Sequence, residues 1–202
     1  MPGRRCVPHA RREVHDRRYP AHVTLRTCVG LPSLRRNDIF VAVRAAFARS
    51  SREGFRLVHY SVQRDHVHLV VEAERHLSLR RGIQGLAIRV AKATNRALCR
   101  RGRVWADRYH VRALTTPREV RHALVYVLQN WRKHLNGVHG FDTRSSAAWF
   151  TGWRTPTTAP PTQPPVVPAQ TWLASVGWRR HGLVRPDEAP RPFLRRRRAP
   201  LR

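Results

Sequence analysis

The stretch "DHVHLVV", residues 65–71, sets the alternation that decides how this chain folds. Successive side chains of a strand point to opposite faces of a sheet, so residues two apart share a face. His66 and His68 therefore project together from one face, and the aliphatic residues that alternate with them project from the other. Two adjacent imidazoles can be half of a metal site, or they can be polar residues on a hydrated face. The pattern predicts a strand and leaves both interpretations of the histidines open.

The segments on both sides of this stretch alternate between strand-like and helix-like patterns. Alternating and β-branched residues predict four strands, at 22–30, 55–63, 65–73 and 106–116. Apolar residues spaced by three or four predict three helices, from Asn37 or Asp38 to about Ser50, at 78–100, and from Thr116 to about Leu135. The β-α-β-β-α-β order predicts an α+β fold of the split βαβ, ferredoxin-like type, with an antiparallel sheet and helices on one face. A third helix and an irregular C-terminal tail are added to that core.

The third predicted helix has a clear start and two different faces. Thr116 and Glu119 have the spacing of a capping box, and Pro117 stands at the first helical position. The apolar residues of this helix fall within an arc of about 100°, which is expected to face the core. The polar side of the helix consists of His122, Tyr126, Asn130 and Lys133.

A polar helix face of this kind has a chemical use if it meets the histidine pair. Two neutral imidazoles and an amide oxygen can hold a divalent cation and leave coordination positions open. Such a cation polarises a phosphoryl oxygen, and Tyr126 could then attack phosphorus to form a covalent phosphotyrosine. Each element also has an ordinary explanation, because surface histidine pairs and helical tyrosines are common. The residues alone predict a basic, nucleic-acid-binding α+β domain.

The charge of the chain points to a polyanionic partner. Forty Lys and Arg residues stand against twelve Asp and Glu residues, which gives a formal net charge of +28. A folded protein with this imbalance repels itself unless a polyanion is present, and nucleic acid is the natural candidate. A GC-rich coding sequence would explain why arginine replaces lysine, but it would not explain why acidic residues are so few.

Composition along the chain predicts three parts: a basic N-terminal arm at 1–18, a domain at 19–140, and a Pro-rich linker with a basic appendage at 141–202. The appendage is too short for a core of its own and is expected to pack against the domain. The three cysteines form no CxxC pair, so we expect them to be reduced thiols. No apolar run approaches the roughly 18 residues of a membrane span, and no secretory signal is visible. We therefore expect a cytoplasmic, nucleoid-associated protein with no membrane partner.

Two motifs resemble those of a known enzyme superfamily. "DHVHLVV" resembles the histidine–hydrophobic–histidine motif of the HUH endonucleases, and "YVLQN" resembles the tyrosine helix of their single-tyrosine transposases. Within that branch the chain is most similar to the REP-associated tyrosine transposases, over about residues 15–155. The stretches "HVTLRTCVGLPSLR", "GRVWADRYHVRALTTPREVRHALVYVLQNWRKH" and "SSAAWFTGW" support this resemblance. It implies a ferredoxin-like core, a single-stranded or hairpin DNA substrate, and a nicking and joining activity that depends on Mg²⁺ or Mn²⁺.

The resemblance also implies roles for particular residues. Tyr126 matches the nucleophile, His66 and His68 match the metal-binding pair, and Asn130 matches the third, amide ligand. The chain departs from the family pattern at two places. Asn130 is followed by tryptophan where the family often has proline, so the helix need not break there. Asp65 stands before the first histidine where asparagine is common, which either tunes the metal or has no effect.

The remaining expectations concern the partner. The residues expected to hold DNA are Arg80, Arg81, Arg89, Lys92, Arg108, His110, Arg112 and Lys133, and those expected to stack on bases are Trp105, Tyr109 or His110. A monomer that uses its own tyrosine is favoured, and a dimer that shares active sites is the other possibility. Two alternatives remain open: a non-catalytic hairpin-binding protein on the same fold, and an RNA-binding ferredoxin-like protein.

Overall fold

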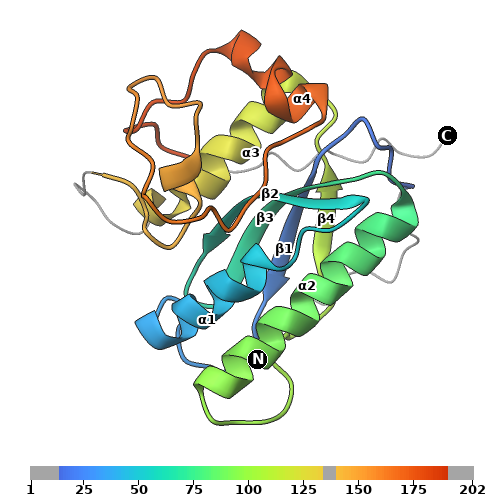
Figure 1. Cartoon of the computed structure of the whole chain (residues 1–202), viewed down its shortest axis with the longest axis vertical. Helices are drawn as coiled ribbons and strands as arrows, with labels where there is room; N and C mark the ends of the chain where they lie inside the picture. The colour runs from blue at the N-terminus through green and yellow to red at the C-terminus, as the bar shows by residue number, and fades with distance from the viewer. Residues whose placement is uncertain (1–13, 134–139, 191–202) are drawn as a thin grey trace, which may run out of the picture.

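Strands and helices alternate along the chain in the predicted order (Figure 1). The computed structural model describes residues 14–133 and 140–190. The main elements are β1 (Ala21–Arg26), α1 (Asn37–Ala48), β2 (Phe55–Val62), β3 (His66–Ala73), α2 (His76–Ala97), β4 (His110–Ala113) and α3 (Pro117–Gln129). The short helices are η1 (Asn130–Lys133), which follows α3, and, in the C-terminal tail, η2 (Ala147–Trp149), α4 (Trp172–Ser175) and η3 (Gly177–His181).

The four strands form one antiparallel sheet in the order β2-β3-β1-β4. Each crossover helix connects two strands that have one other strand between them, which is the split βαβ arrangement. The predicted α+β class and ferredoxin-like topology are therefore confirmed. Two strands are shorter than predicted. β1 ends at Arg26 because Thr27 and Cys28 pair irregularly with the segment around Val104 and Trp105, and β4 begins only at His110.

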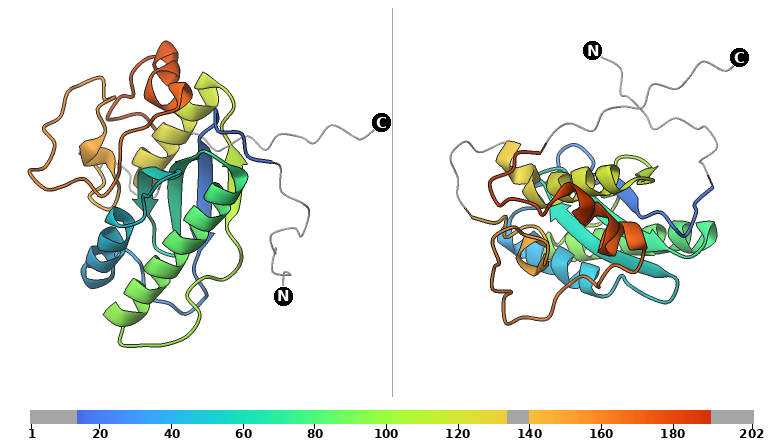
Figure 2. Two further views of the ribbon diagram at one scale, coloured as in Figure 1. Left: turned by 45° about the vertical axis from the view of Figure 1, so that its right-hand side comes forward. Right: turned by 90° about the horizontal axis from the view of Figure 1, so that it is seen from above.

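Helices cover both faces of the sheet (Figure 2). Val67, Leu69 and Val71 of β3 are fully buried in the core that α1 and α2 form on one face. On the opposite face, Val70 packs with Val58 of β2 and Val127 of α3. The alternation in residues 65–71 therefore separates two apolar layers, and it places the two histidines of β3 on the α3 side.

The start of α3 follows the capping pattern in the sequence. The hydroxyl of Thr116 accepts a hydrogen bond from the backbone N–H of Glu119 at 3.2 Å, and Pro117 is the first helical residue. The carboxylate of Glu119 turns back and accepts from the backbone N–H of Thr115 at 2.8 Å. It also forms an ion pair with Arg112 at 2.7 Å, so the first turn of α3 is tied to β4.

The C-terminal tail shares its hydrophobic core with α3. Phe150, Trp153, Leu173 and Trp178 are buried against the apolar stripe of that helix. The tail therefore packs on the domain, as expected of a segment too short for its own core. The segments before and after the expected boundary at residue 140 share one hydrophobic core. The N-terminal arm up to residue 13, residues 134–139 and the basic end from residue 191 lie outside the described residues.

A buried carboxylate holds the tail against β3. Glu72 is 3% exposed, and its two oxygens accept hydrogen bonds from the backbone N–H groups of Gln170 and Thr171 and from the Thr171 hydroxyl, at 2.7–3.0 Å. Hydrogen bonds to a charged group are stronger than neutral ones, so this contact fixes the position of α4, for which Thr171 is the N-cap. In the described ranges, no helix combines the length and apolarity of a membrane span.

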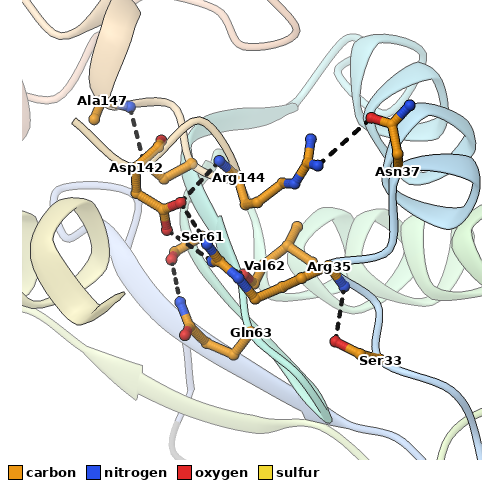
Figure 3. Close-up of polar contacts among 10 residues, drawn as sticks. Ser33, Arg35, Asn37, Ser61, Val62, Gln63, Asp142, Arg144 and Ala147 are labelled. Carbon is orange, nitrogen blue, oxygen red and sulfur yellow. Dashed lines mark hydrogen bonds and ion pairs between the residues drawn. The ribbon is translucent and has the colours of Figure 1, made fainter. Parts of the chain in front are cut away.

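A buried ion pair makes a second connection of the tail, to the loop before α1 (Figure 3). Both guanidinium nitrogens of Arg35 donate to the carboxylate of Asp142, at 2.8 and 2.9 Å, and one of them also donates to the carbonyl of Val62. The side chain of Asp142 is 2% exposed. The loop before α1, the end of β2 and the tail therefore meet at one charged contact.

We predict that Asp142→Asn lowers the free energy of unfolding by about 2–3 kcal/mol, because it leaves the Arg35 guanidinium in a largely buried site without its counter-charge. Urea unfolding followed by tryptophan fluorescence measures the change. Asp38→Asn is the matched control, because Asp38 pairs with Arg36 in an exposed position, and it should cost much less stability than Asp142→Asn. Equal losses in the two variants would contradict a structural role for the buried pair.

Candidate active site on the α3 face of the sheet

The two histidines of β3 lie side by side on the face that α3 covers. The ring centroids of His66 and His68 are 4.7 Å apart, and the ring planes are nearly perpendicular. Nδ1 of His68 lies 3.1 Å from the hydroxyl of Thr24 and 3.3 Å from Nε2 of His22, both on the neighbouring strand β1. The other ring nitrogen of His68, Nε2, is buried. Contacts with β1 therefore fix the orientation of this imidazole.

Tyr126 of α3 packs directly on this histidine cluster. Its ring centroid lies 5.0 Å from that of His68 and 5.8 Å from that of His22, in edge-to-face geometry in both cases. The tyrosine is half-buried, and burial raises the pKa of its hydroxyl above the usual value. The contact is made within one chain, so a tyrosine from a second subunit is not needed to complete it.

Asp65 fixes the orientation of the other imidazole. Its carboxylate lies 2.7 Å from Nδ1 of His66, and its second oxygen accepts from Arg26 at 2.7 Å. Burial by itself would raise the pKa of Asp65, but the hydrogen bond to His66 and the electrostatic attraction of His66 and Arg26 outweigh it and lower that pKa. An ionised carboxylate only accepts hydrogen bonds, so Nδ1 of His66 carries the proton and Nε2 is the nitrogen that can bind a metal.

His22 is a member of this cluster that the sequence did not identify. Its ring stacks on that of His68, with 5.2 Å between centroids, and its side chain is buried. Burial, together with the charge of Arg112, lowers the pKa of His22 to about 3, so this imidazole is neutral at neutral pH. The only signal in the sequence is its alternation with Val23, and that becomes informative only once the pairing of β1 with β3 is known.

The residues expected to hold DNA fall into two groups. Directly opposed residues of antiparallel strands share a face, and β4 pairs His110 with Thr24 and Arg112 with His22. His110 and Arg112 therefore lie beside the histidine cluster, and Arg108 is exposed just before this strand.

The second group of expected DNA-binding residues lies on α2, on the other side of the sheet. Arg80, Arg81, Arg89 and Lys92 are exposed on this helix, whose buried residues pack into the α1 and α2 core. These residues therefore lie on the opposite face of the sheet from α3, which carries Tyr126. The sequence could not show this separation, because a helical period gives the buried side of a helix without the face of the sheet on which it packs.

The remaining site residues follow α3 or precede β4. Asn130 is buried in the first position of η1, one turn after Tyr126, and its backbone remains helical. Lys133 ends η1, and its side chain lies outside the described residues. The indole N–H of Trp105 donates to the carbonyl of Ala87, and Trp105 and Tyr109 both pack against the α1 and α2 core. Of the three residues expected to stack on bases, His110 is the exposed one.

The donor set suits a divalent cation with neutral ligands. Nδ1 of His66 is held by Asp65, and Nδ1 of His68 lies against Thr24 and His22, so Nε2 is the atom of each ring that would coordinate a metal. Within residues 14–133 and 140–190, no group of three His, Cys, Asp or Glu side chains is arranged to hold a metal ion. The expected third ligand, Asn130, is an amide and belongs to none of these types.

These features define a basic α+β domain that carries a tyrosine and histidine cluster on one face of its sheet. Residues 33–130 match the model of the family described as "Transposase IS200 like". No curated protein matches the chain significantly. One similar solved structure is described as "Structure of the REP associates tyrosine transposase bound to a REP hairpin". It is 17% identical, with a TM-score of 0.49, and the alignment covers 63% of this chain and 74% of that one.

We predict that Asp65→Ala weakens Mn²⁺ binding by about tenfold or more, because the variant removes the group that orients His66. Titration of the DNA-free protein, followed by electron paramagnetic resonance, measures the affinity. Nitrogen-15 NMR of the metal-free protein gives a second result, since His66 should lose its single Nδ1–H tautomer. Glu74→Ala, at an exposed carboxylate outside the cluster, is the matched control. An unchanged tautomer in Asp65→Ala would contradict the orienting role of Asp65.

Proposed function

We propose that this chain is a metal-dependent, single-stranded DNA endonuclease and strand transferase that cleaves through a 5′-phosphotyrosine intermediate. The observation that carries the proposal is the contact between Tyr126 and His68 inside one chain, with 5.0 Å between their ring centroids. The match of residues 33–130 to the model of a transposase family supports DNA as the substrate. A basic scaffold that only bound polyanions would not need a tyrosine held against oriented imidazoles.

The proposed metal ligands are Nε2 of His66, Nε2 of His68 and the side-chain oxygen of Asn130. A bound Mg²⁺ or Mn²⁺ would supply Lewis-acid polarisation of the scissile phosphate. The protein holds both imidazoles in place through their Nδ1 atoms before any metal binds. Such preorganisation lowers the entropic cost of assembling the site.

Tyr126 is the proposed nucleophile. Its oxygen forms a bond to phosphorus while the bond from phosphorus to the 3′ oxygen of the preceding nucleotide breaks. The phenol loses its proton, and the departing 3′ oxygen takes one up as a hydroxyl. Because burial raises the pKa of Tyr126, the phenol is protonated at neutral pH and needs a proton acceptor or a nearby positive charge in order to react. Phosphotyrosine keeps the bond energy, so a second 3′ hydroxyl can reverse the step and join strands.

The proposed substrate lies across the face that carries His110 and Arg112. These residues stand beside the cluster on β4, where Arg112 can contact phosphate oxygens and His110 can stack on a base. The resemblance of the two motifs to REP-associated tyrosine transposases supports a hairpin with a flanking single strand as the recognised form of DNA. The contact between Tyr126 and the histidines of its own chain supports a monomer, acting on DNA in the cytoplasm and nucleoid.

We predict that Tyr126→Phe abolishes cleavage of a single-stranded hairpin oligonucleotide and leaves hairpin affinity within about threefold of the wild type. The variant removes the attacking oxygen and keeps the ring that packs on His68. Denaturing gels follow cleavage, and fluorescence anisotropy follows binding. Tyr109→Phe is the matched control, because Tyr109 packs against the other core and should remain active. Nicking by Tyr126→Phe would rule out the proposed nucleophile.

We predict that cleavage requires a divalent cation. His66→Ala lacks a proposed metal ligand and should be inactive both with and without the cation. Wild-type rates should fall to background in EDTA and return with Mg²⁺ or Mn²⁺. His76→Ala is the matched control, because His76 is exposed at the start of α2 and should keep wild-type rates. If EDTA left the wild-type rate unchanged, the metal part of the proposal would be wrong. Hairpin binding without any cleavage by the wild type would favour the non-catalytic alternative.

A further inference from the structure

The outer surface of α1 and α2 contains a basic groove that the proposed reaction does not use. The groove has a volume of about 390 Å³, and alanines of both helices, including Ala42, Ala45 and Ala93, form its floor. Its four charged lining residues are all cations: Arg49, Arg89, Lys92 and Arg96. The helices that form the groove, α1 and α2, lie on the opposite side of the sheet from α3, which carries Tyr126 (Figure 2).

The cations of this groove have no acidic partners. None of the four forms a salt bridge within the part of the chain that the structure describes. α2 is 22 residues long and contains no Asp or Glu. Four uncompensated positive charges around one groove repel one another, and a bound anion would relieve that repulsion.

The cations also continue as a row along α2 beyond the groove. At 100° per residue, Arg81 lies within an arc of about 80° of Arg89, Lys92 and Arg96. From Arg81 to Arg96 the row extends for about 22 Å at 1.5 Å per residue. Gly85 lies inside the same arc, and a Cβ there would meet only the end of the Arg89 side chain, at 3.1 Å. The backbone of α2 is therefore accessible to a close partner in the middle of the row.

We propose that this surface, defined by Arg49, Arg81, Arg89, Lys92 and Arg96, binds the sugar–phosphate backbone of duplex DNA. The row is long enough to follow several phosphates of one strand, which follow each other at about 3.4 Å along the duplex axis. Alanine side chains line the groove between the cations, so a DNA backbone can approach both helices closely. The proposal concerns a face remote from Tyr126 and holds whether or not the chain cleaves DNA.

Two triple variants with the same loss of charge test the proposal. The first is Arg89→Gln, Lys92→Gln and Arg96→Gln, and the control is Arg118→Gln, Arg154→Gln and Arg180→Gln, at exposed positions on α3 and the tail. The probe is a labelled, blunt, 20-base-pair duplex without a hairpin, in EDTA, followed by fluorescence anisotropy over a series of salt concentrations. Because no cleavage takes place in EDTA, the result is independent of the proposed reaction.

The first triple variant should lose tenfold or more in duplex affinity, and the slope of log K against log salt should become shallower by about 2–3, because each lost phosphate contact removes about 0.9. The control should lose less than threefold. Arg89→Lys with Arg96→Lys keeps the charge and should keep duplex affinity within threefold, which separates a loss of charge from misfolding. Equal losses in the two triple variants would overturn the proposal, as would displacement of the duplex by polyglutamate at a lower charge concentration than by unlabelled duplex.

Discussion

The aliphatic contact of Val70 and Val58 with Val127 is the interaction on which the rest of the α3 face depends. These three side chains are 0–3% exposed, and they pack α3 against the face of the sheet opposite α1 and α2. The residue before Val127 is Tyr126, so the same contact that buries the valine determines where the phenol ring lies. A shift of α3 by one residue would rotate the helix by about 100° and move the tyrosine away from His68.

Three charged contacts also hold α3, the C-terminal tail and the loop before α1 in place. Glu119 ties the start of α3 to Arg112 on β4, Glu72 receives the N–H groups that precede α4, and Asp142 receives the guanidinium of Arg35. These carboxylates are three of the chain's twelve acidic residues. The chain therefore uses part of its small supply of acidic residues at structural junctions, which leaves much of the arginine surface without counter-charge and available to a polyanion.

Periodicity in the sequence predicted the elements of the fold but not the faces on which they pack. The alternation around His66 and His68 predicted β3 and a shared face for the two imidazoles, and the Thr116 to Glu119 spacing predicted the start of α3. His22 was missed because its role depends on the pairing of β1 with β3, which no local pattern encodes. The basic residues of α2 were grouped with the tyrosine for the same reason, since helical spacing identifies a buried stripe without identifying the layer that it meets.

The shared core of α3 and the tail has a consequence for the smallest fragment that can fold. A recombinant fragment ending at residue 140 would remove Phe150, Trp153 and Trp178 and expose the apolar stripe of the helix that carries Tyr126. It would also leave the Glu72 carboxylate buried without its donors or force it into solvent. The minimal folding unit therefore extends about sixty residues beyond the segment matched by the family model, to the end of the described tail near residue 190.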